Sequence, residues 1–570
     1  MNKKGFTLVE LLAVIAILAI LVIIALPNVI KLYNNAKKNA FMTEAQNLAK
    51  EVSSKYISES MKGNKVTVIS NKQNPFDMTG SELEYNFELD SQGKIKNMIV
   101  SNGTYCISTN KDYTKITRDD ISDKCSYEKL HNIAGTLKNK FYEESGRTDR
   151  SLVSSVVFYS DGRTIDGSES YDVSEEKDGS VKMYVTQNNE NSSLVDLTIV
   201  ANGKIAFPEH SSYLFLFYKR VGCSPAVSNL SRIEFNNSID TSNVIDMSYM
   251  FKNIEFPVLD STALDLSSFD TSNVTDMSGM FQYSNATALN LNSFNTSKVT
   301  SMRNMFYNSK ATTLDLSSFD TSKVTDMSWM FSRSAATEIK GLDKFNTSNV
   351  SDMSGMFYIS NATALNLSSF DTSKVTSMRS MFGDSEATTL DLSSFDTRNV
   401  VGMGGMFSGS EATEIKGLNK FDTSKVTDMS IMFNDSKATA LDLSSFDTSK
   451  VTYMHRMFAW SAATEIVGLN KFNTSKVTNM NDMFCESQAT TLDLSSFDTS
   501  KVTDMGGMFQ YSNATALDLS SFDTSKVRDM SVMFFGCAAT IGYAKDAQTA
   551  AKFNDSSVTN IPDTLKFTVK

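Results

Sequence analysis

The sequence predicts an α/β chain in which a long hydrophobic N-terminal helix precedes a small β domain and a solenoid of about twelve repeats of 25 or 26 residues. Three observations support this fold class. Residues 6–30 are apolar apart from Thr7, Glu10 and Asn28. Short runs with period-two alternation follow Met61, as expected for strands. From about residue 233 onward one unit recurs, and a period in this range indicates stacked supersecondary units.

The composition argues against a nucleic-acid partner. The 570 residues carry a net charge of -11, and the sequence shows no clustered Lys/Arg face of the kind that a phosphate-backbone binder needs. The chain is also too long for one ordinary core, so we expect either three or four domain-sized pieces or one elongated array with attachments.

The cysteines indicate at most one disulfide and no metal cofactor. All five are widely spaced without a CxxC pair, so zinc is not expected. Cys106 and Cys125 flank a polar segment of 18 residues, and we expect a disulfide between them in an oxidising compartment. Cys485 and Cys537 lie about two repeats apart, roughly 10 Å for strands stacked at ~4.8 Å. Because this exceeds the span of a disulfide, we expect two free thiols on the repeat surface.

The N-terminal apolar run is long enough to cross a bilayer. Residues 11–26 are sixteen uninterrupted apolar residues, and a helix over residues 6–30 is about 37 Å long. A secretory signal peptide would be followed by a small-residue cleavage site, which is missing here. A plain membrane anchor explains the length but not Glu10, because an unpaired carboxylate in hydrocarbon is costly.

The stretch KKGFTLVE, residues 3–10, resembles the type IV prepilin signal. The resemblance implies that a prepilin peptidase cuts between Gly5 and Phe6 and methylates Phe6. It also implies that Glu10 pairs with the free amino group of a neighbouring subunit, which removes two uncompensated charges from an apolar core. The implied partners are this peptidase, other pilin subunits, the assembly platform and the membrane. The implied location is the cell membrane before assembly, with a single pass, and then the cell surface or a pilus.

A helix followed by a small sheet is the plan that this resemblance implies for residues 6 to about 130. Beyond Pro27, apolar residues keep one helix face for about 30 residues. The runs KVTVIS, LEYNFEL, KIKNMIV and TYCIST then alternate as short strands do. The predicted segments are a leader (1–5), the helix (6–60, with a membrane or filament core at 6–30), a β domain (61–130), an entry β domain (131–232), the repeats (233–535) and a C-terminal cap (536–570).

Each repeat begins with a predicted strand and turn, as LDLSSFDTSKVTDMSWMF at residues 314–331 shows. Leu314 and Leu316 alternate inward, and Phe319 is a third inward residue. Asp320 stands in a column that holds Asp or Asn in all twelve copies, always followed by Thr. Short side chains that bond their own backbone suit a fixed turn. Because Asn replaces Asp at three of these positions, we interpret the column as structural and not as a calcium site.

The second half of each repeat is predicted as a short helix. Met327, Met330 and Phe331 fall at i, i+3 and i+4, which indicates a buried helical stripe, and Thr325 is a suitable cap. The 26-residue copies read EIKGLDKF, EIKGLNKF or EIVGLNKF in place of TLDLSSF. We interpret their extra residue, next to a glycine, as a bulge.

The FDTSxVTDMSxMF repeat resembles the BspA-like leucine-rich repeat of bacterial surface proteins over about residues 195–570. It departs from the usual leucine-rich pattern in its Phe-Asp-Thr and its paired methionines. No catalytic motif is found. We therefore expect a non-enzymatic surface protein for adhesion to a host, a bacterium or a surface glycan. The alternative is a pseudopilin of a type II secretion or DNA-uptake machine, in which the repeats contact cargo or the platform.

The two residues after each Met-Phe pair vary most within the repeat, which indicates solvent exposure. Exposed aromatic residues there could form a ligand-binding stripe, and unselected surface variation is the alternative. A second candidate face is the strand column that runs from Asp265 to Asp391. The candidate aromatic residues are Tyr283, Tyr307, Tyr358, Trp460 and Tyr511.

Overall fold

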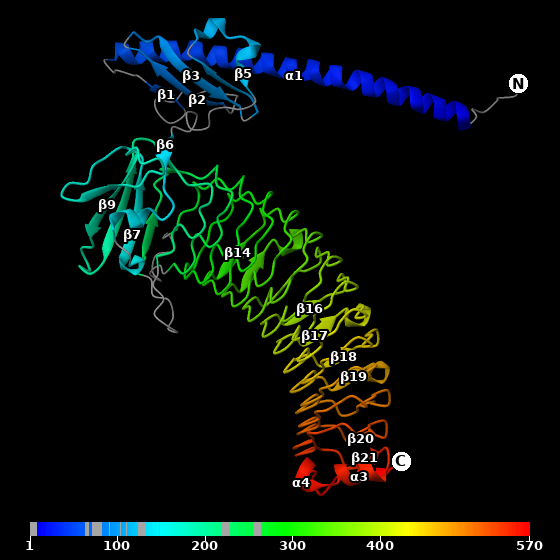
Figure 1. The fold of residues 1–570 in the computed structure, drawn as a ribbon. Helices are drawn as coiled ribbons and strands as arrows, with labels where there is room; N and C mark the ends of the chain where they lie inside the picture. The colour runs from blue at the N-terminus through cyan, green and yellow to red at the C-terminus, as the bar shows by residue number, and fades with distance from the viewer. Residues whose placement is uncertain are drawn as a thin grey trace, which may run out of the picture. The chain divides into compact units, whose positions relative to one another are not determined.

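The computed structural model of the chain describes residues 8–62, 68–70, 83–90, 92–102, 104–109, 111–122, 133–146, 149–217, 229–254 and 264–570. It divides into two compact units, Met1–Ile133 and Ala134–Lys570 (Figure 1). Gly5 and Phe6 lie outside the described residues, and of Glu10 only the backbone is described. Among the residues that were searched, no helix is long and apolar enough to cross a membrane. Side chains of the first helix are described from residue 34 onward, so the apolar run lies outside them.

The first unit combines one long helix with an antiparallel sheet. Helix α1 (Leu8–Met61) is followed by five strands that pair in chain order. Each strand therefore hydrogen-bonds to the next one along the chain. These strands are β1 (Val68–Ser70), β2 (Glu84–Leu89), β3 (Ile95–Ser101), β4 (Cys106–Thr109) and β5 (Ile121–Ser122).

The helix and the sheet of the first unit share one core. The buried helix residues recur at i, i+4, i+7, i+8 and i+11, which confirms the predicted apolar face in this part of the helix. They are Phe41, Ala45, Leu48, Ala49 and Val52.

The structure describes only one of the two cysteines of the expected disulfide. Cys106, at the start of β4, is disulfide-bonded. Cys125 lies outside the described residues, so the pairing of these two cysteines stays a prediction.

The second unit opens with two small sheets. In the larger sheet the strand order is β12-β7-β10-β9-β8, with the first three strands parallel and the last two joined antiparallel. The smaller sheet has the order β13-β11-β6. The strands are β6 (Ile133–Thr136), β7 (Val153–Tyr159), β8 (Glu169–Asp172), β9 (Val181–Gln187), β10 (Val195–Ala201), β11 (Lys204–Ala206), β12 (Arg232–Glu234) and β13 (Ile239–Asp240).

The repeats form a stack of coils, one coil for each repeat (Figure 1). Parallel bridges join one residue of each coil to its equivalent in the next, from Asp246 to Asp529. Short parallel strand pairs add to these bridges. The pairs are β14 (Thr313–Asp315) with β15 (Glu338–Lys340), β16 (Thr389–Asp391) with β17 (Glu414–Lys416), and β18 (Ala440–Asp442) with β19 (Glu465–Val467).

One apolar core runs through the sheets and the coils of this unit, from Leu137 to Phe567. The predicted inward residues of the repeat are buried in it; Phe331, for example, is 0% exposed. The ring of Phe331 stacks on that of Phe357 in the next coil, with centroids 5.5 Å apart and planes at 11°. The same contact recurs from Phe215 to Phe534 as a phenylalanine ladder.

The Asp-Thr pair closes a turn and also joins neighbouring coils. Asp320 Oδ1 accepts the Ser322 N–H at 2.9 Å, which confirms the predicted local turn. Thr321 is 1% exposed, and its hydroxyl faces the next coil. Thr321 Oγ1 donates to the Asn346 carbonyl at 3.0 Å and accepts the Asn346 N–H at 2.8 Å. The Thr column is therefore held by contacts between coils.

The predicted helix in the second half of the repeat is wrong. The segment forms consecutive turns in which alternate N–H groups donate to the next coil. Met327 donates to the Asp352 carbonyl at 3.2 Å and Phe331 to the Met356 carbonyl at 2.9 Å. Trp329 between them has a left-handed backbone with φ 59°. This conformation turns alternate N–H groups toward the next coil, whereas the Met330 N–H donates to the Met327 carbonyl of its own coil at 3.2 Å. Pairing between coils therefore interrupts the hydrogen-bond pattern that an α-helix would need.

Two further local interpretations are corrected. Thr325 caps no helix; its hydroxyl donates to the Thr300 carbonyl of the preceding coil at 3.1 Å. The extra residue of the 26-residue copies is absorbed by a left-handed glycine and a 3-10 helix, not by a bulge. Gly341 has φ 88°, and a Cβ there would lie 2.7 Å from the Leu316 backbone. The 3-10 helices are η5 (Leu342–Lys344), η6 (Leu418–Lys420) and η7 (Leu469–Lys471).

The C-terminal segment closes the apolar core of the stack. The ring of Phe534 meets the rings of Phe553 at 5.6 Å and Phe567 at 4.9 Å, and the phenylalanine ladder ends there. Short helices and strands make up this end of the described chain. The elements are β20 (Ala516–Leu519), β21 (Ile541–Ala544), α3 (Ala547–Phe553), α4 (Ser556–Thr559) and β22 (Phe567–Val569).

Candidate surface site on the coil stack

The five candidate aromatic residues lie in two neighbouring columns of the stack. Tyr307 and Tyr358 directly follow the Phe of the Met-Phe pair and are half-buried. Tyr283, Trp460 and Tyr511 follow it by two residues, and their side chains are 43%, 40% and 46% exposed. We call these the first and the second exposed column.

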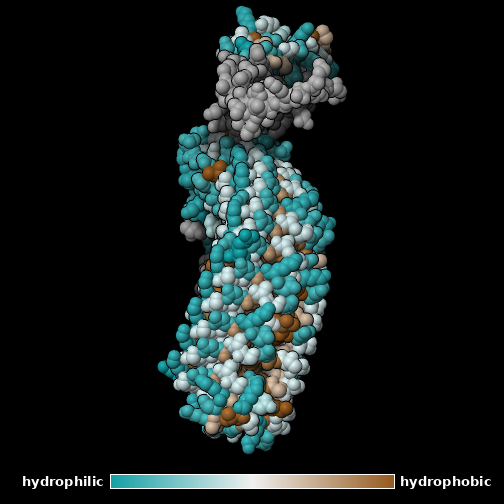
Figure 2. All heavy atoms as spheres, turned by 90° about the vertical axis from the view of Figure 1, so that its right-hand side faces the viewer, coloured by the Kyte–Doolittle hydropathy of each residue, from teal (hydrophilic) through white to brown (hydrophobic). Residues whose placement is uncertain are grey.

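Every described residue of the second exposed column has a left-handed backbone. Tyr283, Trp460 and Tyr511 have φ of 59°, 56° and 53°. Each of these residues donates its N–H to a carbonyl of the next coil at 2.7–2.8 Å. The backbone of these residues thus hydrogen-bonds to the next coil, and their side chains project from the stack. Figure 2 shows one face of the stack, with hydrophilic and neutral rows from coil to coil and separate small hydrophobic patches.

The structure brings only some of the candidates together. The rings of Tyr283 and Tyr307 meet edge to face with centroids 5.3 Å apart. Tyr358 instead meets Trp329 at 5.6 Å. The Arg333 guanidinium lies 5.8 Å from the centre of the Tyr358 ring, within the range of a cation–π contact.

Trp329 and Tyr249 are aromatic residues that the sequence analysis missed. Both stand between the paired methionines, in a column that is also left-handed. Their rings lie over glycines of the next coil, because a Cβ on Gly355 would be 2.4 Å from the Trp329 ring and one on Gly279 2.2 Å from the Tyr249 ring. The sequence signal for this contact is a large aromatic residue in one repeat and a glycine at the equivalent position of the next repeat.

A second aromatic group lies toward the C-terminal end of the stack. Trp460, Glu486 and Tyr511 hold the second exposed column in three consecutive coils, with φ of 56°, 52° and 53°. The rings of Tyr511 and Phe535 meet edge to face at 5.1 Å, and Phe535 is 41% exposed. Phe535 was also missed, although it follows a Met-Phe pair directly.

Two carboxylates lie close enough to the thiol of Cys485 to affect its pKa. Burial of the thiol, and then the carboxylates of Asp482 and Glu486, raise the pKa of Cys485 to about 11, while Arg456 opposes them. Cys485 and Cys537 are free and buried, so the prediction of free thiols is confirmed and their expected surface position is wrong.

The strand column is less suited to a ligand because its aspartates already accept hydrogen bonds from the backbone of their own turns. Asp265, Asp315 and Asp391 each accept the N–H of the serine two residues later at 2.9–3.0 Å. The hydroxyl and then the N–H of Ser317 lower the pKa of Asp315 below its ordinary value. Lys340 in the same column lies 3.7 Å from Glu338.

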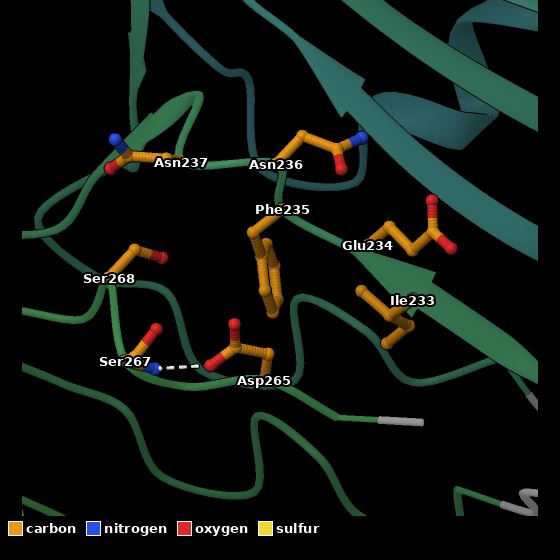
Figure 3. Close-up of a pocket in the computed structure, with 8 residues that line it drawn as sticks. All are labelled: Ile233, Glu234, Phe235, Asn236, Asn237, Asp265, Ser267 and Ser268. Atoms are coloured by element: carbon orange, nitrogen blue, oxygen red, sulfur yellow. Dashed lines mark hydrogen bonds between the residues drawn. The ribbon is translucent and has the colours of Figure 1, made fainter. Parts of the chain in front are cut away.

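A cleft of about 510 Å³ lies between β12 and the turn after Asp265 (Figure 3). Its polar groups are largely engaged within the protein: Asp265 accepts the Ser267 N–H, and the Asn236 amide donates to the Phe158 carbonyl at 3.1 Å. Among the described residues, no group of three or more His, Cys, Asp or Glu side chains could hold a metal ion.

Two family models match the chain, and neither a curated protein nor a solved structure does. The model described as a prokaryotic N-terminal methylation motif matches residues 1–26, which confirms the type IV pilin-like start. The model described as "Mycoplasma protein of unknown function, DUF285" matches residues 223–340, 325–415, 392–465 and 459–568. Because these matches cover more than half of the chain, the protein belongs to this family. The likeness to BspA-like repeats stays a prediction.

Proposed function

We propose that the protein is a minor type IV pilin-like subunit, without catalytic activity, that displays a leucine-rich-repeat-type solenoid outside the cell for adhesion to a protein or glycan. The N-terminal methylation motif at residues 1–26 is the observation that carries this proposal. A prepilin peptidase would process such a motif, and the mature subunit would assemble with other pilins.

Glu10 has a physical role in this proposal. After cleavage between Gly5 and Phe6, the amino group of Phe6 carries a positive charge in an apolar helix. An unpaired carboxylate or ammonium in hydrocarbon is costly, whereas the two groups together neutralise each other. Pairing of Glu10 with Phe6 of a neighbouring subunit would therefore favour transfer from the membrane into a filament.

The second unit suits display of a surface. One core runs from Leu137 to Phe567, so each coil supports the next without a separate scaffold. The exposed columns carry residues that differ from coil to coil, and this variation is compatible with recognition. A unit of residues 134–570 is large beside the first unit. Its bulk favours the tip or a low-copy position in a filament.

The mass of the surface-released protein tests the proposal. We expect a mature chain that begins at methylated Phe6 in the wild type, and an unprocessed chain in Gly5→Ala. Glu10→Gln is the matched variant, because it should be cleaved normally but should not enter filaments. An intact Met1 in the wild type would refute processing. Loss of the export of other proteins in a strain that lacks this chain would instead favour the pseudopilin alternative.

A further inference from the structure

The exposed columns change their electrostatic character along the stack. Near the N-terminal end the aromatic rings lie beside a cation: burial and then Tyr307 raise the pKa of Tyr283, and Arg333 opposes them. Toward the C-terminal end Trp460 and Tyr511 hold the same column one coil before and one coil after the exposed Glu486. The two halves of the same columns therefore suit different ligands.

The spacing of the coils sets how far Glu486 lies from its two neighbours in the column. The buried rings of consecutive coils at this level, Phe458, Phe484 and Phe509, are 5.4 Å and 5.7 Å apart. One coil step thus separates Glu486 from the aromatic residue on either side of it. A cation is attracted to an aromatic face within about 6 Å of its centre. A positively charged group seated beside Glu486 would therefore lie close to a ring as well.

Glu486 is an exposed acidic group outside the ion pairs that engage two acidic groups of neighbouring coils. Asp482 pairs with Arg456 at 3.0 Å, and Asp435 pairs with Lys437 at 2.7 Å. Among the described residues, no ion pair forms with the carboxylate of Glu486, whose field contributes to the raised pKa of Cys485.

We propose that Trp460, Glu486 and Tyr511 form a cation-binding site that receives a lysine or arginine side chain from a basic segment of a partner protein. The carboxylate supplies the counter-charge, and the ring faces supply cation–π attraction. Because the side chains are exposed on consecutive coils, an extended basic segment has access along the column. This inference rests on the proposed function, since it names the partner class of the displayed surface.

Binding of a fluorescent octalysine peptide to the full-length chain in detergent tests the site. Each attraction is expected to be modest at an exposed position, so Glu486→Gln and Trp460→Ala should each weaken binding about threefold. The double variant should weaken it about tenfold if the two contributions add. Added salt should weaken binding to the wild type, because the pairs are exposed.

Two control variants separate the site from the general negative charge of the chain. Glu190→Gln removes the same charge from an exposed position in the entry sheets, and Tyr283→Ala removes an exposed ring from the other half of the column. Both should bind octalysine like the wild type. Tyr511→Ala should weaken binding as Trp460→Ala does, and matched thermal melting curves would show that the variants are folded.

Equal binding of wild type, Glu486→Gln and Trp460→Ala would overturn the inference. So would a loss in Glu190→Gln or Tyr283→Ala as large as that in the site variants. The outcome is independent of the pilin pathway, because the purified chain is used. Failure of processing at Phe6 would refute the proposed function while leaving a measured octalysine site intact.

Discussion

Replacement of Thr321 by Val tests the link between coils, because the two side chains have nearly the same shape. The hydroxyl of Thr321 accepts the Asn346 N–H at 2.8 Å and donates to the Asn346 carbonyl at 3.0 Å. Valine leaves both groups without this partner. An unpaired buried polar group costs about 1–3 kcal/mol. Since Thr321 is 1% exposed, we expect Thr321→Val to lose about 2–4 kcal/mol of unfolding free energy.

Urea unfolding followed by circular dichroism measures this loss, with Thr321→Ser as the matched control. Serine keeps the hydroxyl and removes one methyl group, which costs about 1 kcal/mol. In a repeat array a weakened interface can also uncouple the two flanking parts, so the slope of the transition should be compared as well. A valine variant that is as stable as the serine variant would refute the hydrogen-bond argument.

Three further predictions concern Gly341, Asp320 and Cys485. Gly341→Ala should lose more than about 2 kcal/mol in urea unfolding, because φ is 88° and the new Cβ would meet the preceding coil at 2.7 Å. Gly167→Ala, with φ 76° and open space, should lose only about 1 kcal/mol, and equal losses would exclude the clash. The hydroxyl and the N–H of Ser322 lower the pKa of Asp320 from its ordinary value of 3.8. Its carboxylate therefore stabilises the fold above that value and loses this effect as the pH falls through the lowered pKa. Asp320→Asn should thus make urea unfolding less pH-dependent below about pH 4, and an unchanged profile would contradict this. Cys485, with its pKa raised to about 11, should resist alkylation at about pH 8 until urea unfolds the chain; mass spectrometry would detect fast labelling in the folded state, which would argue against its burial.

The inward residues of the repeat could be predicted because they depend on local alternation and apolar character. Leu314, Phe319 and Phe331 are buried as expected. The predicted helix failed for a physical reason: an i, i+3, i+4 apolar pattern also fits a chain of turns. Left-handed residues such as Trp329 are costly in isolation. They are stable here because each turn pairs alternate N–H groups with the next coil.

The candidate site could be predicted only in part, because exposure follows from local variation whereas contacts between coils do not. Variation after each Met-Phe pair correctly indicated that Tyr283, Trp460 and Tyr511 are exposed. The partners of each ring come from other coils, 25 or 26 residues away. Sequence proximity therefore did not reveal that Trp329 meets Tyr358.

The sequence by itself determined the pilin-like start, the repeat period and the identity of the inward side chains, because each follows from a motif or from the local polarity of the chain. The tertiary structure decided how the coils are joined. The Thr321 hydroxyl, the left-handed columns and the phenylalanine ladder all depend on a neighbouring coil. Contacts between residues one repeat apart fix the backbone there, and these contacts exist only once the coils are stacked.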